Sequence, residues 1–345
     1  MATRILGHQR GQGAPPPAGW IGEGLLKSKA GDLRVSTLTT RAPDPFDFVG
    51  TAYSHGWAVL HPNRWDGPRA RLTRTQRIGP DRVFHLTIRG TGPPARRQIR
   101  VEVTHRGRLA AAEKAAIRSS VRRMLRLDED LSEFHALCLE AGGRWRPAAQ
   151  GLGRLLRSPT VFEDVVKTIC TTNVQWAGTK SMVRSLVDQL GEPGPLSAGG
   201  DSAAAEDWPA AFPTVEAIAR ADDRTLEAAR LGYRAPYVRE LAKRVANGEL
   251  DLEAWLSPDT STEELRRSLL AIKGIGPYAA ATMLMLLGRY DQLAVDSVYR
   301  TFVAETYFGG KRPSDREAEQ VYSRWGRWKY LGYWFDLWQT SDAEA

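Results

Sequence analysis

A carboxylate that follows a glycine-rich turn is the feature of this sequence best suited to chemistry. Asp296 lies 20 positions after Gly276, the second glycine of the turn KGIG at residues 273–276. A carboxylate held beyond such a turn could stabilise positive charge at the C1′ atom of a sugar and orient an attacking water, as carboxylates do in glycoside hydrolysis. Asp is also a common N-cap, so the alternative is that Asp296 only begins the helix that follows it.

The residues around this turn predict two helices joined by a hairpin, at residues 262–288. Ser261 and Glu264 form a capping box that begins the first helix. Apolar residues follow from Leu265 at i, i+4 and i+7, which places them on one helical face. Pro277 suits the first turn of the second helix, where its missing N–H costs nothing.

The hairpin is predicted to bind a phosphate of the DNA backbone. Gly274 and Gly276 allow positive φ angles and a close approach of the backbone. The unpaired N–H groups of the turn and of the next helix form an anion site. Lys273 adds a positive charge, and Ile275 is expected to fill the core between the helices. The alternative is an ordinary glycine-capped helix turn without a ligand.

The composition excludes several kinds of metal chemistry. The chain has 345 residues, of which 42% are hydrophobic and 26% charged, and its net charge of +8 suits a polyanionic partner. Two cysteines, Cys138 and Cys170, are too few for an iron–sulfur cluster or a four-cysteine zinc site. All six histidines lie at or before His135. No metal ligands are therefore predicted, and catalysis in the C-terminal part must use carboxylates, Lys, Tyr or hydroxyls.

The sequence predicts neither a membrane segment nor a signal peptide. The longest apolar run, near residues 279–287, is shorter than the roughly 18–20 residues that a membrane-spanning helix needs. Residues 1–20 lack the apolar centre of a signal peptide. A cytoplasmic location is expected, with association with the nucleoid if the protein is bacterial.

The chain is predicted to be α+β, with a tail, a β domain and a helical domain. Residues 1–30 are rich in Gly, Pro and Ala and are expected to form a flexible tail. Residues 108–345 are predicted to be helical, with a flexible insertion at residues 191–213. An antiparallel β domain is predicted at residues 31–107 from the segments LRVSTLTT, FDFVGTAY, WAVLHP, ARLTRTQRI, RVFHLTIRG and RQIRVEVTH. Early helices are predicted at RLAAAEKAAIRSSVRRMLRL, VFEDVVKTIC and GTKSMVRSLVDQLG, the last ending at Gly191.

Several blocks between Arg108 and Trp338 resemble, in order and spacing, the helix-hairpin-helix superfamily of DNA glycosylases. The sequence is most similar to the bacterial inducible 3-methyladenine DNA glycosylases and to the 8-oxoguanine DNA glycosylases. The resemblance implies an N-terminal antiparallel β unit, a two-lobed all-α glycosylase core, and base excision repair of double-stranded DNA by a monomer. The blocks that carry it are VRRMLRLDEDLSEFHA, GRLLRSPTVFEDVVKTICTTN, FPTVEAIA, LGYRAPYV, the hairpin, LAVD and WGRWKYLGYW.

By this resemblance Asp296 is the catalytic aspartate, and no cofactor is required. Bifunctional members of the family carry a lysine two residues after the second glycine of the hairpin, where this chain has Tyr278. The sequence therefore predicts a monofunctional enzyme, without Schiff-base lyase activity, that flips an alkylated purine such as 3-methyladenine and hydrolyses its N-glycosidic bond with an Asp296-assisted water. A monovalent cation held by hairpin carbonyls is also compatible with the resemblance.

The segment CTTNVQW aligns with the family loop that enters the DNA stack. Asn173 falls where the family has the residue that fills the gap left by the flipped base. Gln175 and Trp176 lie close by and could take the same role. The alternative for Asn173 is an ordinary residue in a helix kink.

Aromatic residues are predicted to form the base pocket, because electron-rich rings stack well on a cationic alkylated base. Tyr333 and Trp338, in the C-terminal helix predicted for SRWGRWKYLGYWFDLWQ, are candidates, and Trp176 is a third. Tyr278 is either a core aromatic or a wall of this pocket. Packing into the core is the alternative for most rings of the C-terminal helix.

Two other functions are compatible with the sequence. The segments LGYRAPYV and CTTN favour an oxidised-purine glycosylase of the 8-oxoguanine type, but Ser297 and Val298 follow Asp296 without the histidine that this group tends to carry there. A non-catalytic protein that binds DNA structures would need the hairpin and would not need Asp296.

Overall fold

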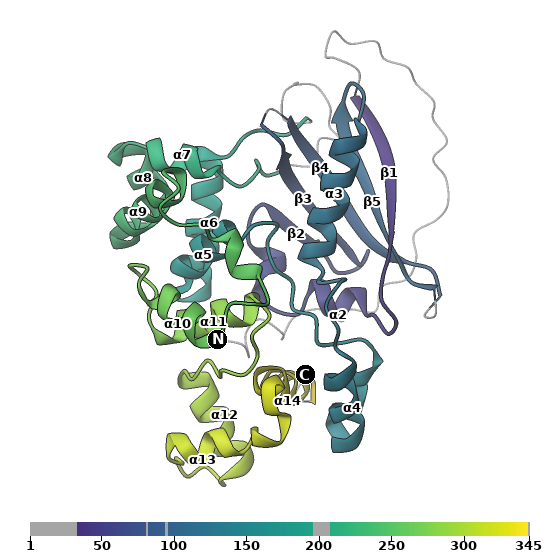
Figure 1. Cartoon of the computed structure of the whole chain (residues 1–345), viewed down its shortest axis with the longest axis vertical. Coiled ribbons are helices and arrows are strands. Elements are labelled where there is room, and N and C mark those ends of the chain that lie inside the picture. Colours follow the sequence, from purple (N-terminus) through teal and green to yellow (C-terminus); the bar gives the residue numbers. More distant parts are fainter. Residues whose placement is uncertain (1–32, 81, 94–95, 196–207, 344–345) are drawn as a thin grey trace.

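An antiparallel five-stranded sheet with strand order β1-β5-β4-β3-β2 forms the first part of the chain (Figure 1). The computed structural model describes residues 33–80, 82–93, 96–195 and 208–343, so the predicted tail lies outside the described residues. Alternate residues of the strands face the core, as in β5, where Ile99, Val101 and Val103 are buried. The strands are β1 (Leu33–Arg41), β2 (Asn63–Asp66), β3 (Arg71–Ile78), β4 (Arg82–Thr91) and β5 (Gln98–Arg106).

The helix α3 (Ala111–Met124) lies against this sheet (Figure 1). Ile117, Val121 and Met124 recur at helical spacing and are buried, so the helix presents one apolar face to the strands. Its polar start is tied to β4, because the Glu113 carboxylate pairs with Arg82 at 2.7 Å.

Two of the segments predicted as strands are helical. FDFVGTAY contains α2 (Phe48–Ala52), and WAVLHP begins in the 3-10 turn η1 (Gly56–Val59). The Asp47 side chain caps α2 by accepting a hydrogen bond from the backbone N–H of Gly50 at 2.9 Å. Trp57 is buried in the core. The prediction was wrong here because a short buried apolar segment has the same pattern whether it forms a helical turn or a strand.

Two groups of helices lie beside and below the sheet (Figure 1). Helices α5 to α11 form one lobe, and α4 with α12 to α14 form the other. Together with the sheet, these lobes confirm the predicted α+β class. The helices are α4 (Ser132–Ala141), η3 (Gly143–Gln150), α5 (Val161–Thr171), α6 (Trp176–Leu190), α7 (Val215–Arg220), α8 (Asp223–Ala228), η4 (Gly232–Arg234), α9 (Ala235–Ala246), η5 (Glu253–Leu256), α10 (Thr262–Leu270), α11 (Pro277–Leu286), α12 (Ser297–Tyr307), α13 (Asp315–Gln320), η6 (Ser323–Trp328) and α14 (Lys329–Ala343).

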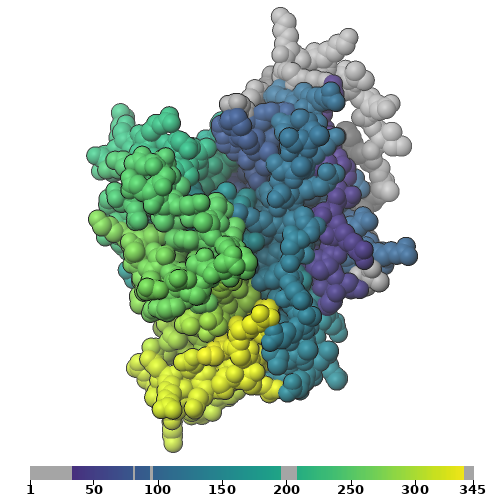
Figure 2. Space-filling model, viewed as in Figure 1, coloured from purple at the N-terminus to yellow at the C-terminus, as the bar shows by residue number. Residues whose placement is uncertain are grey.

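A buried ion cluster joins the sheet to α5, and Figure 2 shows the helical part of the chain packed against the β domain. Arg74 of β3 contacts the Glu163 carboxylate at 2.8 Å, and the Lys167 ammonium contacts it at 2.7 Å. Burial alone would raise the pKa of Glu163, but the charges of Arg74 and Lys167 outweigh it and lower the pKa to about 2. The cluster therefore holds the β domain in a fixed position against the helix that leads to the candidate site.

Part of the predicted insertion at 191–213 is ordered by the sheet. Residues 196–207 lie outside the described residues, but both ends are described. Gly191 ends α6 as predicted, and the N–H of Ala211 donates to the carbonyl of Glu192 at 2.8 Å. The Trp208 ring lies 4.4 Å from that of His85, between ring centroids. The described ends therefore pack on the β domain.

The aromatic C-terminal segment was predicted to be one helix, but the chain bends at Gly326 and divides it in two. This residue has φ 51° and ψ −123°, and it separates η6 from α14. The bend brings Trp325 back against α14, where its ring fills the space that a side chain at position 332 would occupy. Trp325 and Trp328 are both buried in the core, as expected for most of these rings.

Candidate active site and DNA-binding surface

The predicted helix-hairpin-helix is formed by α10 and α11. Ser261 and Glu264 make the predicted capping box, and Pro277 is the first residue of α11. Leu265 and Leu269 are buried on one face of α10. These local signals were sufficient because each depends on residues within one turn of the helix ends.

The hairpin itself uses its two glycines differently. Gly274 has φ +90°, and a Cβ there would also lie 2.9 Å from the ring of Tyr237, so position 274 requires glycine twice over. Gly276 has φ −92°, so of the two glycines that could adopt a positive φ angle only Gly274 does. No heavy atom lies within 4 Å of a Cβ built on Gly276, so its backbone faces open space. Ile275 is buried and Lys273 is exposed, which leaves the backbone and one cation at the surface.

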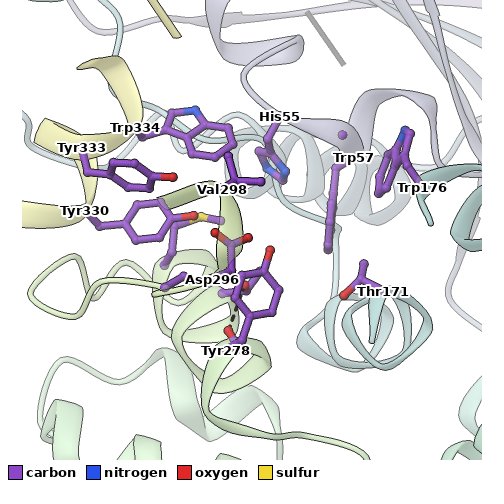
Figure 3. Close-up of a pocket in the computed structure, with 14 residues that line it drawn as sticks. His55, Trp57, Thr171, Trp176, Tyr278, Asp296, Val298, Tyr330, Tyr333 and Trp334 are labelled. Atoms are coloured by element: carbon purple, nitrogen blue, oxygen red, sulfur yellow. Dashed lines mark hydrogen bonds between the residues drawn. The ribbon is translucent and has the colours of Figure 1, made fainter. Parts of the chain in front are cut away.

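Asp296 is both the N-cap of α12 and a pocket residue. Its Oδ1 atom accepts a hydrogen bond from the backbone N–H of Tyr299 at 2.8 Å. The carboxylate is half-buried and is directed into the pocket drawn in Figure 3. The capping bond fixes the orientation of the carboxylate, so the two roles considered for Asp296 are compatible.

Segments from distant parts of the sequence surround this pocket (Figure 3). They come from the β domain, from α5 and α6, from α11, from the segment that leads into α12, and from α14. Half of the lining residues are aromatic, and Asp296 is the only acidic residue among the described residues that line the pocket. The lining residues are His55, Gly56, Trp57, Thr171, Trp176, Tyr278, Thr282, Met285, Ala294, Asp296, Val298, Tyr330, Tyr333 and Trp334.

Three tyrosines face the Asp296 carboxylate, which lies among them in Figure 3. Burial raises the pKa of Tyr278, Tyr330 and Tyr333, and the negative charge of Asp296 raises each of them further. The phenols therefore stay protonated at neutral pH. They can donate hydrogen bonds, and none of them is a nucleophile or base.

Of the four predicted pocket residues, Tyr278, Trp176 and Tyr333 line the pocket together. Tyr278 is 39% exposed, which favours the pocket wall over the core for this ring. The fourth, Trp338, belongs to α14, but its side chain lies outside the described residues. Trp334, one helical turn earlier, lines the pocket and stacks on Tyr330 with an interplanar angle of 13°.

The sequence did not identify the contribution of the β domain. His55, Gly56 and Trp57 belong to η1 or precede it and line the pocket. A Cβ at Gly56 would lie 2.3 Å from the Trp176 ring, so glycine is required for these two segments to meet. The indole N–H of Trp57 donates to Asp164 at 2.7 Å, which fixes the ring. No local pattern marks these residues, because their role depends on a contact between distant segments.

The loop between α5 and α6 carries the predicted stack-filling residues. Asn173 is exposed and has φ +47°, and Gln175 is exposed at the start of α6. The amide of Asn173 donates to the hydroxyl of Tyr233 at 3.4 Å, and Tyr233 is itself 52% exposed. The rings of Tyr233 and Tyr237 are 6.1 Å apart, and Tyr237 packs against the hairpin. The loop, Tyr233 and the hairpin thus belong to one continuous surface beside the pocket.

The cysteines offer no reactive thiol. Both Cys138 and Cys170 are free and buried, and burial raises the pKa of each thiol to about 12. Among the described residues, no group of three His, Cys, Asp or Glu side chains could hold a metal ion. In the same part of the chain, no helix is long and apolar enough to cross a membrane.

Comparison with known proteins supports the resemblance seen in the sequence. Residues 166–327 match the family model of the HhH-GPD superfamily base excision DNA repair proteins. A curated relative, the N-glycosylase/DNA lyase of Saccharomyces cerevisiae, is 26% identical over 167 residues, which cover 45% of this chain. The match spans only 42% of the length of that relative.

Solved structures with the same fold include two kinds of glycosylase. The 3-methyladenine DNA glycosylase of Archaeoglobus fulgidus has a TM-score of 0.65 at 20% identity, covering 88% of this chain and 98% of its own. The 8-oxoguanine glycosylase/lyase of Clostridium acetobutylicum, in complex with DNA, has a TM-score of 0.62 at 15% identity, covering 91% and 99%. At these identities the likeness confirms the fold, and the two neighbours act on different bases.

Proposed function

We propose that this chain, whose residues 166–327 match the HhH-GPD superfamily model, is a monofunctional DNA glycosylase that releases alkylated purines such as 3-methyladenine. The observation that carries the proposal is the Asp296 carboxylate, which is fixed by its capping bond and opens into an aromatic pocket beside the hairpin. Double-stranded DNA with a damaged base is the substrate, and the protein acts as a monomer.

The proposed reaction is hydrolysis of the N-glycosidic bond. The bond between C1′ and the base nitrogen breaks, and its electron pair leaves with the base. Asp296 stabilises the positive charge that develops on the sugar, as a fixed charge does best in a site that excludes water. A water oxygen then bonds to C1′ and gives its proton to the carboxylate. For a cationic alkylated base, the products are a neutral base and an abasic sugar.

The pocket wall supports alkylated purines as the substrate class. Trp176, Trp334 and Tyr330 line the pocket, and a cationic base gains about 1–2 kcal/mol by stacking on such a ring in a desolvated site. An oxidised-purine glycosylase remains the second candidate. It is favoured by the exposed tyrosine of LGYRAPYV, Tyr233, which is hydrogen-bonded to Asn173.

A panel of damaged duplexes tests this function. The purified protein is incubated with duplexes that carry methylated purines, 8-oxoguanine, hypoxanthine or uracil, and strand breaks are measured with and without alkali. Breaks that need alkali and occur with methylated DNA would agree with the proposal. Breaks with 8-oxoguanine alone would favour the second candidate, and tight binding without breaks would favour a non-catalytic protein.

Lys273 is proposed to bind a DNA phosphate, together with the backbone of the hairpin. The Lys273→Ala variant is expected to bind all duplexes more weakly by a similar factor. The slope of log affinity against log salt concentration should fall by about 1, because one fewer counterion is released. Fluorescence anisotropy with damaged and undamaged duplexes at several salt concentrations measures both quantities.

The matched control is Arg118→Ala, which removes the same charge from an exposed position of α3. Its salt dependence should equal that of the unmodified protein. A loss of affinity in Lys273→Ala for one sequence or one lesion alone would contradict the phosphate role. The monovalent cation that the family resemblance allows at the hairpin carbonyls stays a prediction.

A further inference from the structure

His55 is a buried polar side chain in the pocket wall to which the proposed reaction assigns no role. It is 6% exposed, and its ring lies between Trp334 and Trp57 in Figure 3. The centroids of the His55 and Trp57 rings are 4.9 Å apart, and the indole N–H of Trp334 donates to the carbonyl of Ser54 at 3.0 Å. The imidazole therefore packs on the Trp57 ring, and the Trp334 indole is bonded to the residue before it.

One hydrogen bond fixes which nitrogen of His55 carries the proton. The Nε2 atom lies 2.5 Å from the carbonyl oxygen of Leu156, and a carbonyl oxygen can only accept. Nε2 therefore carries a hydrogen. Burial lowers the pKa of His55 to about 4, and Arg126 and Lys167 lower it too, so the ring is neutral at physiological pH. A neutral ring with hydrogen on Nε2 has a bare acceptor at Nδ1.

This acceptor has no partner among the described residues. His55 makes its one hydrogen bond through Nε2, and Nδ1 is not among the fully buried polar atoms that lack a partner. Because the ring borders the cavity, the accessible surface of Nδ1 belongs to the pocket. The Asp296 carboxylate and the tyrosine hydroxyls come from other segments of the wall, so Nδ1 of His55 is an acceptor that the β domain contributes to the pocket.

We propose that Nδ1 of His55 accepts a hydrogen bond from an N–H group of the flipped base. The pocket then selects purines that present such a donor, such as the exocyclic amine of 3-methyladenine, over purines without one. This inference rests on the proposed glycosylase function and narrows its substrate class. A base without a donor would leave Nδ1 buried and unpaired, which is the usual source of selectivity for a hydrogen-bonding substrate.

The test compares His55→Gln with the unmodified protein on two substrates. The Gln side chain can keep a donor near the Leu156 carbonyl while it removes the acceptor at the Nδ1 position. One substrate is methylated DNA containing 3-methyladenine, which has N–H groups. The other is a duplex with 1,N6-ethenoadenine, whose base has none. Single-turnover rates of base release are measured for both substrates. If release from one duplex is too slow to detect, the dissociation constant of that duplex is measured for both proteins and compared instead.

We expect His55→Gln to lower release of 3-methyladenine about tenfold, the effect of one lost hydrogen bond. The release rate or dissociation constant measured with the ethenoadenine duplex should stay within about twofold of that of the unmodified protein. The control His85→Gln changes a histidine that is also buried, with a pKa lowered by burial to about 4, but that does not line the pocket. It should leave the ratio of the two substrates unchanged.

The other outcomes separate the inference from the function on which it rests. An equal loss on both substrates, with a lower melting temperature, would mean that His55 is only structural. Rates that do not change with either substrate would also overturn the inference. The variant His55→Asn guards against misfolding, because its amide oxygen can replace Nδ1 while the Leu156 bond is lost. It should keep the selectivity at a lower melting temperature. An unmodified protein that releases no base from any duplex would contradict the proposed function itself.

Discussion

The Asp296→Asn variant is expected to release damaged bases at least about 1,000-fold more slowly while it binds damaged DNA with unchanged affinity. The loss follows from removing the only acidic side chain among the described residues that line the pocket. A fixed negative charge beside the developing sugar cation is the main stabilisation that the proposed mechanism contains. Single-turnover kinetics measure the release rate, and anisotropy measures binding.

Asparagine is chosen because it caps helices about as well as aspartate. The bond from the Tyr299 N–H to position 296 can therefore persist, and the melting temperature should change little. Asp222→Asn is the matched control, since Asp222 caps α8 in the same way and does not line the pocket. Undiminished release by Asp296→Asn would refute the mechanism, and loss of folding in both variants would show that capping dominates.

The hairpin illustrates what could be predicted from the sequence. Its capping box, the positive φ of Gly274, the buried Ile275 and Pro277 at the start of α11 all follow from local rules. Each rule depends on contacts between residues that are close in sequence, so the local sequence is sufficient to predict them. The same holds for Asp296, whose capping role was weighed from its position before a helix.

The pocket illustrates what local rules could not supply. His55, Gly56 and Trp57 come from the β domain and meet Trp176 through a close contact between distant segments. Trp57 belonged to a segment predicted as a strand, because a buried helical turn and a short strand share apolar composition, and His55 and Gly56 lay between two such segments. The buried ion pair between Arg74 and Glu163 of α5 also joins distant segments, so no local sequence pattern predicts it.

The pocket rings of the C-terminal segment were identified only in part, for a different reason. Helical spacing was applied across Gly326, where the chain bends, so the register of the rings that follow could not be fixed. Trp334 and Tyr330 line the pocket in addition to the predicted Tyr333. A bend at glycine interrupts the helical spacing from which a buried face is predicted. The relative position of η6 and α14 is then set by the packing of Trp325 on α14, which the sequence does not show.

The Tyr278→Lys variant is expected to gain a covalent reaction that the unmodified protein lacks. Tyr278 is the second residue of α11 and lines the pocket with Asp296. A lysine there could attack C1′ as the base leaves, form a Schiff base with the sugar and allow β-elimination of the strand. Borohydride should then trap a protein–DNA complex with the variant, and strand breaks should occur without alkali. The unmodified protein should give neither.

The control Tyr233→Lys places an amine on the exposed surface beside Asn173 and outside the pocket. It should not be trapped, because its amine cannot reach C1′ of a nucleotide held at Asp296. The trapping reaction should be slow in Tyr278→Lys, since the neighbouring carboxylate favours the charged ammonium form of the new lysine. If Tyr278→Lys still releases the base but is never trapped, position 278 does not face the sugar. Trapping of the unmodified protein would mean that another amine reaches C1′ and that the monofunctional assignment is wrong.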